Sequence, residues 1–275
     1  MLMLLLALLC GLGAAVLRGF QLTGSFDPRT ALIERGDPVT VGLIVLSAVF
    51  TAAAVAYALV SKRGQTPAKP AGTVWFFTQF AALAALLAAS GLDLRSGFAG
   101  EKTQWGVVCL SLLGLFSCGA LLMIALNINK LPFTSAAGFW ATVPVFWACL
   151  TLVADFWGQM GNPVRNTFIY GMLATVCCTL ALYTLAGFFF DKVKPGRVLL
   201  FAFPGIYFAI LTSGGFLLGS WLGDPVVTLS PAAVLRLAFM ALHLTAAAAA
   251  VLYGRFTPPV SEPEPELVEE DSASA

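Results

Sequence analysis

Three ionisable side chains inside long apolar runs are the residues of this sequence that could do chemistry: Asp155, Arg236 and His243. An ionisable group within a bilayer is costly and is therefore a candidate for function. Arg236 and His243 are seven residues apart, so a helix places both on one face. Asp155 lies near the end of another run. The sequence predicts an intramembrane polar face formed by these three residues.

Two arrangements of this polar face are open. In the first, Asp155 pairs with Arg236 across two helices, and His243 lines a cavity below them. In the second, the Arg236 side chain extends to the headgroups, and His243 bonds a backbone carbonyl of a neighbouring helix. The second arrangement needs no functional site and is favoured. A proton-coupled pump is disfavoured in either case, because the chain has a single His and no acid in the middle of a run.

Prolines inside two of the runs are candidate helix kinks, at Pro144 and at Pro204 with Gly205. A proline removes one helical hydrogen bond and can free backbone carbonyls for a polar ligand. Membrane helices also tolerate proline as an ordinary kink. The prolines therefore indicate a binding site only together with other polar groups.

Enzyme chemistry has little support in the sequence. Ser213 in Leu211-Thr-Ser-Gly-Gly215, with His243 on the next run, resembles the serine–histidine dyad of intramembrane rhomboid proteases. Leu211 stands where that pattern has Gly, and the family's other signatures are missing. HExxH and CxxC motifs are absent, so no metal or cofactor is expected. The six cysteines all lie within apolar runs and are expected to pack as small apolar residues.

The composition indicates that the chain folds in a lipid bilayer rather than in water. The chain is 59% hydrophobic and 11% charged, and its mean hydropathy is +0.89, whereas soluble domains are about 45–50% apolar and about 25% charged. The apolar residues form runs near the ~20-residue length that crosses a bilayer. These runs are apolar all round and too long for membrane strands, which need only ~9–11 alternating residues. The sequence predicts an all-α, polytopic transmembrane helical bundle.

We expect about eight spans, or seven if the first run is cleaved as a signal peptide. An uncleaved helix is favoured, because no Lys or Arg precedes the run. Leu9, directly before Cys10, also does not fit a lipoprotein-type cleavage site. Trp75, Trp105 and Trp157 lie near span ends, where such rings settle among headgroups. The expected spans are Met3–Val16, Val39–Val60, Gly72–Leu92, Trp105–Leu126, Ala137–Trp157, Thr167–Phe190, Val198–Leu218 and Ser230–Tyr253.

Charge outside the spans suggests orientation and location. Loops on the side of both termini hold eight Lys and Arg, and the opposite loops hold six. This bias favours both termini in the cytoplasm of a cell-membrane protein. A transmembrane domain over 1–254 is followed by a tail over 255–275, whose six acids and four prolines predict disorder. The net charge of +1 gives no basis for nucleic-acid binding.

Six segments of the sequence are similar to known proteins: Gly11-Leu-Gly-Ala-Ala-Val-Leu-Arg18, Gln21-Leu22, Phe26-Asp27-Pro28, Thr30-Ala-Leu32, Pro144-Val-Phe-Trp147 and Ala186-Gly187-Phe188. Through these segments the sequence resembles a group of bacterial multi-span membrane proteins that has no established activity. The resemblance covers most of the chain loosely and is most specific in the first loop. It implies a shared architecture and carries over no catalytic residues.

Two classes of function remain. One is a carrier, or a membrane subunit of a transport system, for a small solute, with a cavity between the fifth, seventh and eighth spans. The other is a membrane scaffold or sensor that contacts other membrane proteins through its helices, its acidic tail or its first loop. That loop, Arg18 to Pro38, is the longest and most polar internal loop. A solvated pocket reached by His243 and Asp155 would favour the carrier, and a closed bundle the scaffold.

Overall fold

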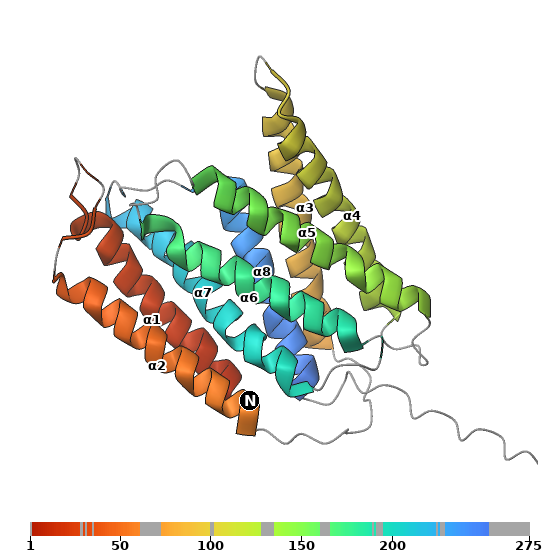
Figure 1. Cartoon of the computed structure of the whole chain (residues 1–275), viewed down its shortest axis with the longest axis horizontal. Coiled ribbons are helices and arrows are strands. Elements are labelled where there is room, and N and C mark those ends of the chain that lie inside the picture. The colour runs from red at the N-terminus through yellow and green to blue at the C-terminus, as the bar shows by residue number, and fades with distance from the viewer. Residues whose placement is uncertain are drawn as a thin grey trace, which may run out of the picture.

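The chain folds into a bundle of long α-helices in the computed structural model (Figure 1). The structure describes residues 2–27, 30, 32–34, 36–60, 73–99, 102–127, 135–159, 166–188, 190, 195–223, 225 and 229–252. Within these ranges eight helices are long and apolar enough to cross a membrane, which confirms the all-α multi-span prediction. They are α1 (Leu2–Gly24), α2 (Pro38–Val60), α3 (Thr73–Ala99), α4 (Trp105–Asn127), α5 (Ser135–Gln159), α6 (Ile169–Phe188), α7 (Pro195–Leu222) and α8 (Pro231–Leu252).

The outer faces of these helices are covered with large apolar side chains. On α2, for example, Val41, Ile44 and Val49 are each more than half exposed. Exposed apolar surface of this extent is unfavourable in water and is stable in lipid. Because the helices satisfy their own backbone hydrogen bonds, they can cross the hydrocarbon core. The protein is therefore a multi-pass membrane protein.

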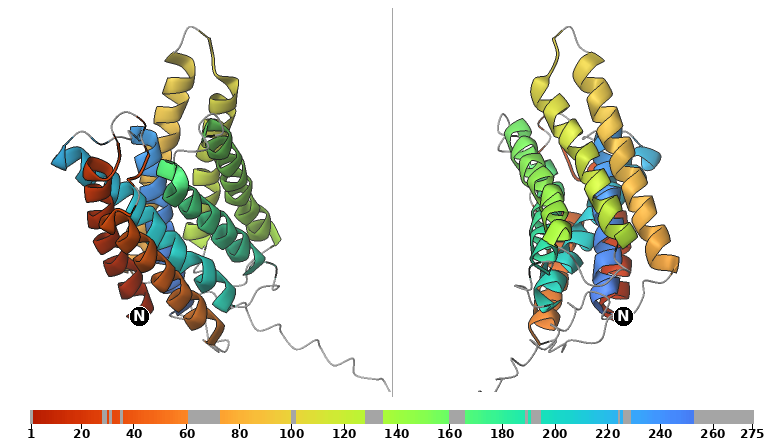
Figure 2. Two further views of the ribbon diagram at one scale, coloured as in Figure 1. Left: turned by 60° about the vertical axis from the view of Figure 1, so that its left-hand side comes forward. Right: turned by 90° about the vertical axis from the view of Figure 1, so that its right-hand side faces the viewer.

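Six of the described helices form a closed ring, and the other two pack on its outside. Each of α3 to α8 packs on the next in chain order, and α8 closes the ring on α3. The α1–α2 hairpin lies against α7 (Figures 1 and 2). Helix α7 therefore contacts both parts of the bundle. The end of the bundle where α1 finishes and α8 begins is called the Arg18 end below.

Glycines allow α1 to approach α7 closely. A Cβ at Gly215 would lie 2.5 Å from Cγ of Arg18, and one at Gly214 would lie 2.9 Å from Cβ of Ala15. On the facing side, a Cβ at Gly19 would lie 3.0 Å from Cβ of Leu218. Small residues at such positions are typical of membrane helix contacts, where close packing is the main attraction. This contact fixes where the Arg18 side chain lies.

Helix bounds correct two of the expected loops. The loop predicted from Arg18 begins only after Gly24, because α1 continues six residues past Arg18. The third span was expected to end at Leu92, yet α3 continues to Ala99 and includes Asp93. Close packing of α1 on α7 and of α3 on α8 outweighs the polar residues that had indicated helix ends. The predicted tail, 255–275, lies outside the described residues.

One of the expected interfacial tryptophans is also placed differently. Trp105 and Trp157 are largely exposed near the Arg18 end of the bundle, as headgroup-level rings would be. The Trp75 ring is instead buried against small residues, among them Ala125, Ala246 and Ala250. Its place near a helix end therefore reflects packing between helices rather than contact with headgroups.

Candidate functional site

An ion-pair cluster joins three helices of the ring near the Arg18 end. Oδ1 of Asp155 on α5 lies 3.8 Å from Nη1 of Arg236 on α8. Oδ2 of Asp93 on α3 lies 3.9 Å from Nε of the same arginine. All three side chains are partly exposed, so Arg236 is both paired and accessible. Of the two predicted arrangements, the geometry matches the pairing of Asp155 with Arg236.

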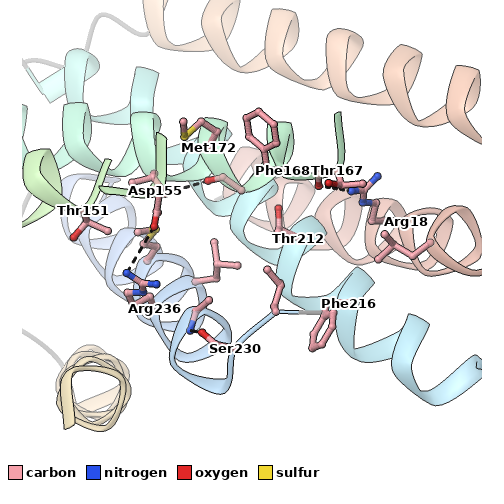
Figure 3. Close-up of a pocket in the computed structure, with 17 residues that line it drawn as sticks. Arg18, Thr151, Asp155, Thr167, Phe168, Met172, Thr212, Phe216, Ser230 and Arg236 are labelled. Atoms are coloured by element: carbon pink, nitrogen blue, oxygen red, sulfur yellow. Dashed lines mark hydrogen bonds and ion pairs between the residues drawn. The ribbon is translucent and has the colours of Figure 1, made fainter. Parts of the chain in front are cut away.

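A cavity of about 320 Å³ lies beside this cluster, among α1, α5, α6, α7 and α8 (Figure 3). We call it the arginine pocket. Along α8 it extends from Ser230 to Met240, which at ~1.5 Å per residue is ~15 Å, or about half of a ~30 Å hydrocarbon core. Its polar lining consists of Arg18, Thr151, Asp155, Thr167, Thr175, Thr212, Ser230 and Arg236.

Arg18 lines the side of the pocket opposite the Asp155–Arg236 pair (Figure 3). Its residue exposure is only 4%. The guanidinium donates to the Thr167 carbonyl oxygen at 2.7 Å and to Oε1 of Gln21. The ring of Tyr170 lies 5.1 Å away, at a distance typical of a cation–π contact. The two ion pairs that join described residues to one another both involve Arg236, so Arg18 is a buried cation without a carboxylate partner among the described residues.

A chain of hydrogen bonds connects Arg18 to the start of α2. Gln21, which accepts from Arg18, donates from Nε2 to Oγ1 of Thr40 at 2.7 Å. Thr40 in turn donates from Oγ1 to Oδ2 of Asp37 at 2.6 Å and from its backbone N–H at 2.7 Å. These bonds from Thr40 hold the pKa of the Asp37 carboxyl below its usual range. Asp37 thereby caps α2 and orients the polar chain that leads to Arg18.

Threonine hydroxyls give the pocket hydrogen-bond acceptors. Thr151, Thr175 and Thr212 each donate to the carbonyl oxygen four residues earlier, at 2.8, 3.1 and 2.8 Å. A hydroxyl that already donates its proton offers only lone pairs to a ligand. The pocket therefore combines donors on the arginines with acceptors on the threonines and Asp155. Such a lining suits a ligand that carries both an acid group and hydrogen-bond donors.

His243 does not line the arginine pocket. It lines a separate cavity of about 50 Å³ between α3, α4, α5, α6 and α8. Its Nδ1 lies 3.0 Å from Oε1 of Gln79, and its Nε2 is buried with no partner among the described residues. The expected bond to a backbone carbonyl is therefore replaced by a bond to a side-chain amide. The cavity is large enough to hold a water molecule.

An aromatic contact between α5 and α8 is part of the packed interior of the ring. On α5, Trp147 lies between Thr151, which lines the arginine pocket, and Pro144, which lines the His243 cavity. The Trp147 ring packs edge-on against Phe239 of α8, with 5.6 Å between centroids. Both residues are almost fully buried. Neither residue is among the described residues that line the two cavities, so this contact belongs to the packed core.

The candidate kinks and the candidate nucleophile also have defined surroundings. Helices α5 and α7 continue through Pro144 and Pro204. A Cβ at Gly205 would lie 2.5 Å from Cδ1 of Leu244, so this glycine permits close contact of α7 with α8. Ser213 donates to the Ala209 carbonyl at 2.7 Å, whereas His243 bonds Gln79. Ser213 and His243 are thus engaged with different partners.

Three polar residues of the arginine pocket, the ion-pair cluster and the His243 cavity are not predicted as such by the sequence. Arg18 and Asp93 had been assigned to loops, and Gln79 had not been singled out. A signal for Arg18 was present in the small residues Gly11, Ala15 and Gly19, whose helical spacing continues past the predicted end of the first span. No comparable local signal marks Gln79, whose role depends on its contact with α8.

Comparisons with protein-family models, with curated proteins and with solved structures find no match for this chain.

Proposed function

We propose that the protein is a carrier, or the membrane subunit of a transport system, for a small solute that bears an acid group. The observation that supports this best is Arg18, a buried cation that lines a membrane-embedded cavity without a carboxylate partner among the described residues. A buried charge is strongly destabilising unless it is compensated. An anionic ligand would supply the compensation, and its affinity would come from that interaction.

The other polar groups define the rest of the solute. The threonine oxygens accept hydrogen bonds from the pocket side, and the Asp155 carboxylate is partly exposed. Hydroxyl or ammonium groups on the solute would bind these acceptors. Arg236 already has two carboxylate neighbours, so Arg18 is the better partner for the acid group. A hydroxy acid or an amino acid fits this combination.

The interior of the ring offers a route for such a solute. From the arginine pocket it would pass the packed contact of Trp147 with Phe239, which would act as a plug, and reach the His243–Gln79 cavity. Movement of α5 against α8 would open the plug, since each of the two rings belongs to one of these helices. In transporters, sites near the bilayer midplane are commonly exposed to alternate sides by such movements.

Uptake into proteoliposomes tests the proposal. Radiolabelled lactate, glycolate, alanine and butyrate serve as probes, and Gly171→Leu serves as the blocking variant. Gly171 lines the pocket, and a Cβ there meets only Cγ2 of Thr212, at an ordinary 3.5 Å. Leucine should therefore fill the cavity without disturbing the helices. Gly119→Leu is the matched control, because a Cβ there meets nothing within 4 Å.

We expect uptake of at least one probe above protein-free liposomes, reduced at least tenfold by Gly171→Leu and unchanged by Gly119→Leu. Uptake of none of the probes, or equal uptake by both variants, would contradict the proposal. In the first case the scaffold or sensor role becomes the better account.

A further inference from the structure

A second and larger cavity opens on the lipid-facing side of the bundle. It has a volume of about 750 Å³ and runs between α2 and α6 over the surface of α7. We call it the α2–α6 groove. Both helices pack on α7, and their facing side chains line the groove. Most of that lining is apolar, as at Ile44, Val55, Leu173, Leu180 and Phe208.

The groove has a polar end and an apolar end. Arg18, Gln21 and Thr40 line it at the Arg18 end. On α2 the lining continues from Thr40 to Val55, which at ~1.5 Å per residue is ~22 Å. That length is about three quarters of a ~30 Å hydrocarbon core. The shape and polarity therefore match one extended alkyl chain with a charged head.

Arg18 is the one described residue that lines both the groove and the arginine pocket. Its guanidinium contacts Thr167, which lines the pocket, and Tyr170, which lines the groove. An acid group bound to Arg18 could therefore extend its substituents to either side. Polar substituents would meet the threonines, and an alkyl chain would enter the groove.

We infer that the ligand of this site is a long-chain anionic amphiphile, whose acid group binds Arg18 and whose alkyl chain lies in the α2–α6 groove. The inference rests on the proposed role of Arg18 as the acid-binding group, and it adds to the small solute a second class of ligand whose chain lies outside the ring. Charge complementarity selects this occupant over an uncharged lipid, because the head end of the groove presents a buried cation without a carboxylate partner among the described residues. Apolar contacts alone would not favour one long-chain ligand over the surrounding lipid, since bulk lipid offers the same contacts.

Photolabelling tests the inference. The probe is hexadecanoic acid with a diazirine near its methyl end, added to the full-length protein in phosphatidylcholine nanodiscs. Crosslinked peptides are mapped by mass spectrometry. We expect labels to concentrate on groove residues near the apolar end, such as Val55, Leu180 and Leu200. Unlabelled hexadecanoate should suppress labelling at least fivefold, and hexadecanol, which has the same chain without the charge, should not.

Two alanines of α2 provide matched variants. Ala48 lines the groove, whereas Ala53 is exposed on another face of the helix. Ala48→Trp should fill the groove and abolish the localised labelling, and Ala53→Trp should leave it unchanged. Arg18→Gln should abolish the preference for hexadecanoate over hexadecanol. Because Ala48→Trp leaves Arg18 in place, the test does not depend on the folding of the arginine variant.

The outcomes separate this inference from the proposed function. Labels spread evenly over the lipid-facing helices, equal competition by hexadecanol, or equal labelling of the two tryptophan variants would overturn the inference. If short acids were still taken up through the arginine pocket, the carrier would stand without a ligand in the α2–α6 groove. If labelling were localised but no acid crossed the bilayer, the amphiphile site would stand and the carrier would fail.

Discussion

Arg18 of α1 lies against the ring of Tyr170 of α6, with 5.1 Å between the guanidinium carbon and the ring centroid. This contact links the hairpin outside the ring of helices to the ring itself. It holds a positive charge at the boundary between a polar pocket and an apolar groove.

Close contact between α1 and α7 should be required to position Arg18. A Cβ at Gly215 would lie 2.5 Å from Cγ of Arg18, so Gly215→Val should force the helices apart. Overpacking of this kind costs about 1–3 kcal/mol. We expect a lower unfolding temperature for the purified variant in detergent. Gly13→Val is the control, because a Cβ at Gly13 meets nothing within 4 Å. Equal stability of the two variants would show that the contact is loose.

The cap on α2 should make stability depend on pH. Bonds from Thr40 lower the pKa of Asp37, so the folded state favours the ionised carboxyl. Its contribution is present above the unfolded pKa of about 3.9 and is lost as the pH falls below that value through the folded pKa. Asp37→Ala should therefore cost about 1 kcal/mol near neutral pH, and the difference from wild type should shrink toward pH 3. Unfolding temperatures measured across this range check it.

Glu34→Gln is the control for the Asp37 prediction, since it removes an exposed carboxylate from the same connection. Its effect should be near zero throughout the range. A loss of stability in Asp37→Ala that did not change with pH would mean that the cap acts by shape and not by charge.

Substitutions in the ion-pair cluster around Arg236 should differ in their effect on stability. Arg236→Gln leaves Asp93 and Asp155 without their cation, whereas Asp155→Asn still leaves the arginine paired with Asp93. We therefore expect Arg236→Gln to destabilise the protein more than Asp155→Asn. A double-mutant cycle should give a coupling energy of about 1 kcal/mol between Asp155 and Arg236. Strictly additive effects would mean that the 3.8 Å pair contributes nothing to stability.

Run length and composition were sufficient to predict the helical membrane architecture, because a bilayer imposes a length and a polarity on every span. Helix ends were less predictable. Arg18 and Asp93 indicated loops by their charge, but contacts with α7 and α8 keep both within helices. Such contacts join residues far apart in the sequence and leave only a weak pattern of small residues along one helix.

The same distinction applies to the candidate site: single residues could be identified from the sequence, and contacts between helices could not. Asp155, Arg236 and His243 could be singled out as ionisable residues in apolar runs, and their role in function stays a prediction. Two separate cavities could not be foreseen, because each is lined by side chains from five different helices. The partner of His243 is likewise 164 residues away in the sequence.

Thermal stabilisation by small acids tests the central claim most directly. The unfolding temperature of the purified protein is measured with and without lactate and butyrate, for wild type, Arg18→Lys, Gly171→Leu and the control Gly119→Leu. We predict that at least one acid raises the unfolding temperature of wild type and of Gly119→Leu. The rise should be smaller in Arg18→Lys, which keeps the charge but loses the planar fork, and absent in Gly171→Leu. Failure of both acids to stabilise wild type, or an equal rise in Gly171→Leu, would contradict an acid-binding site at Arg18.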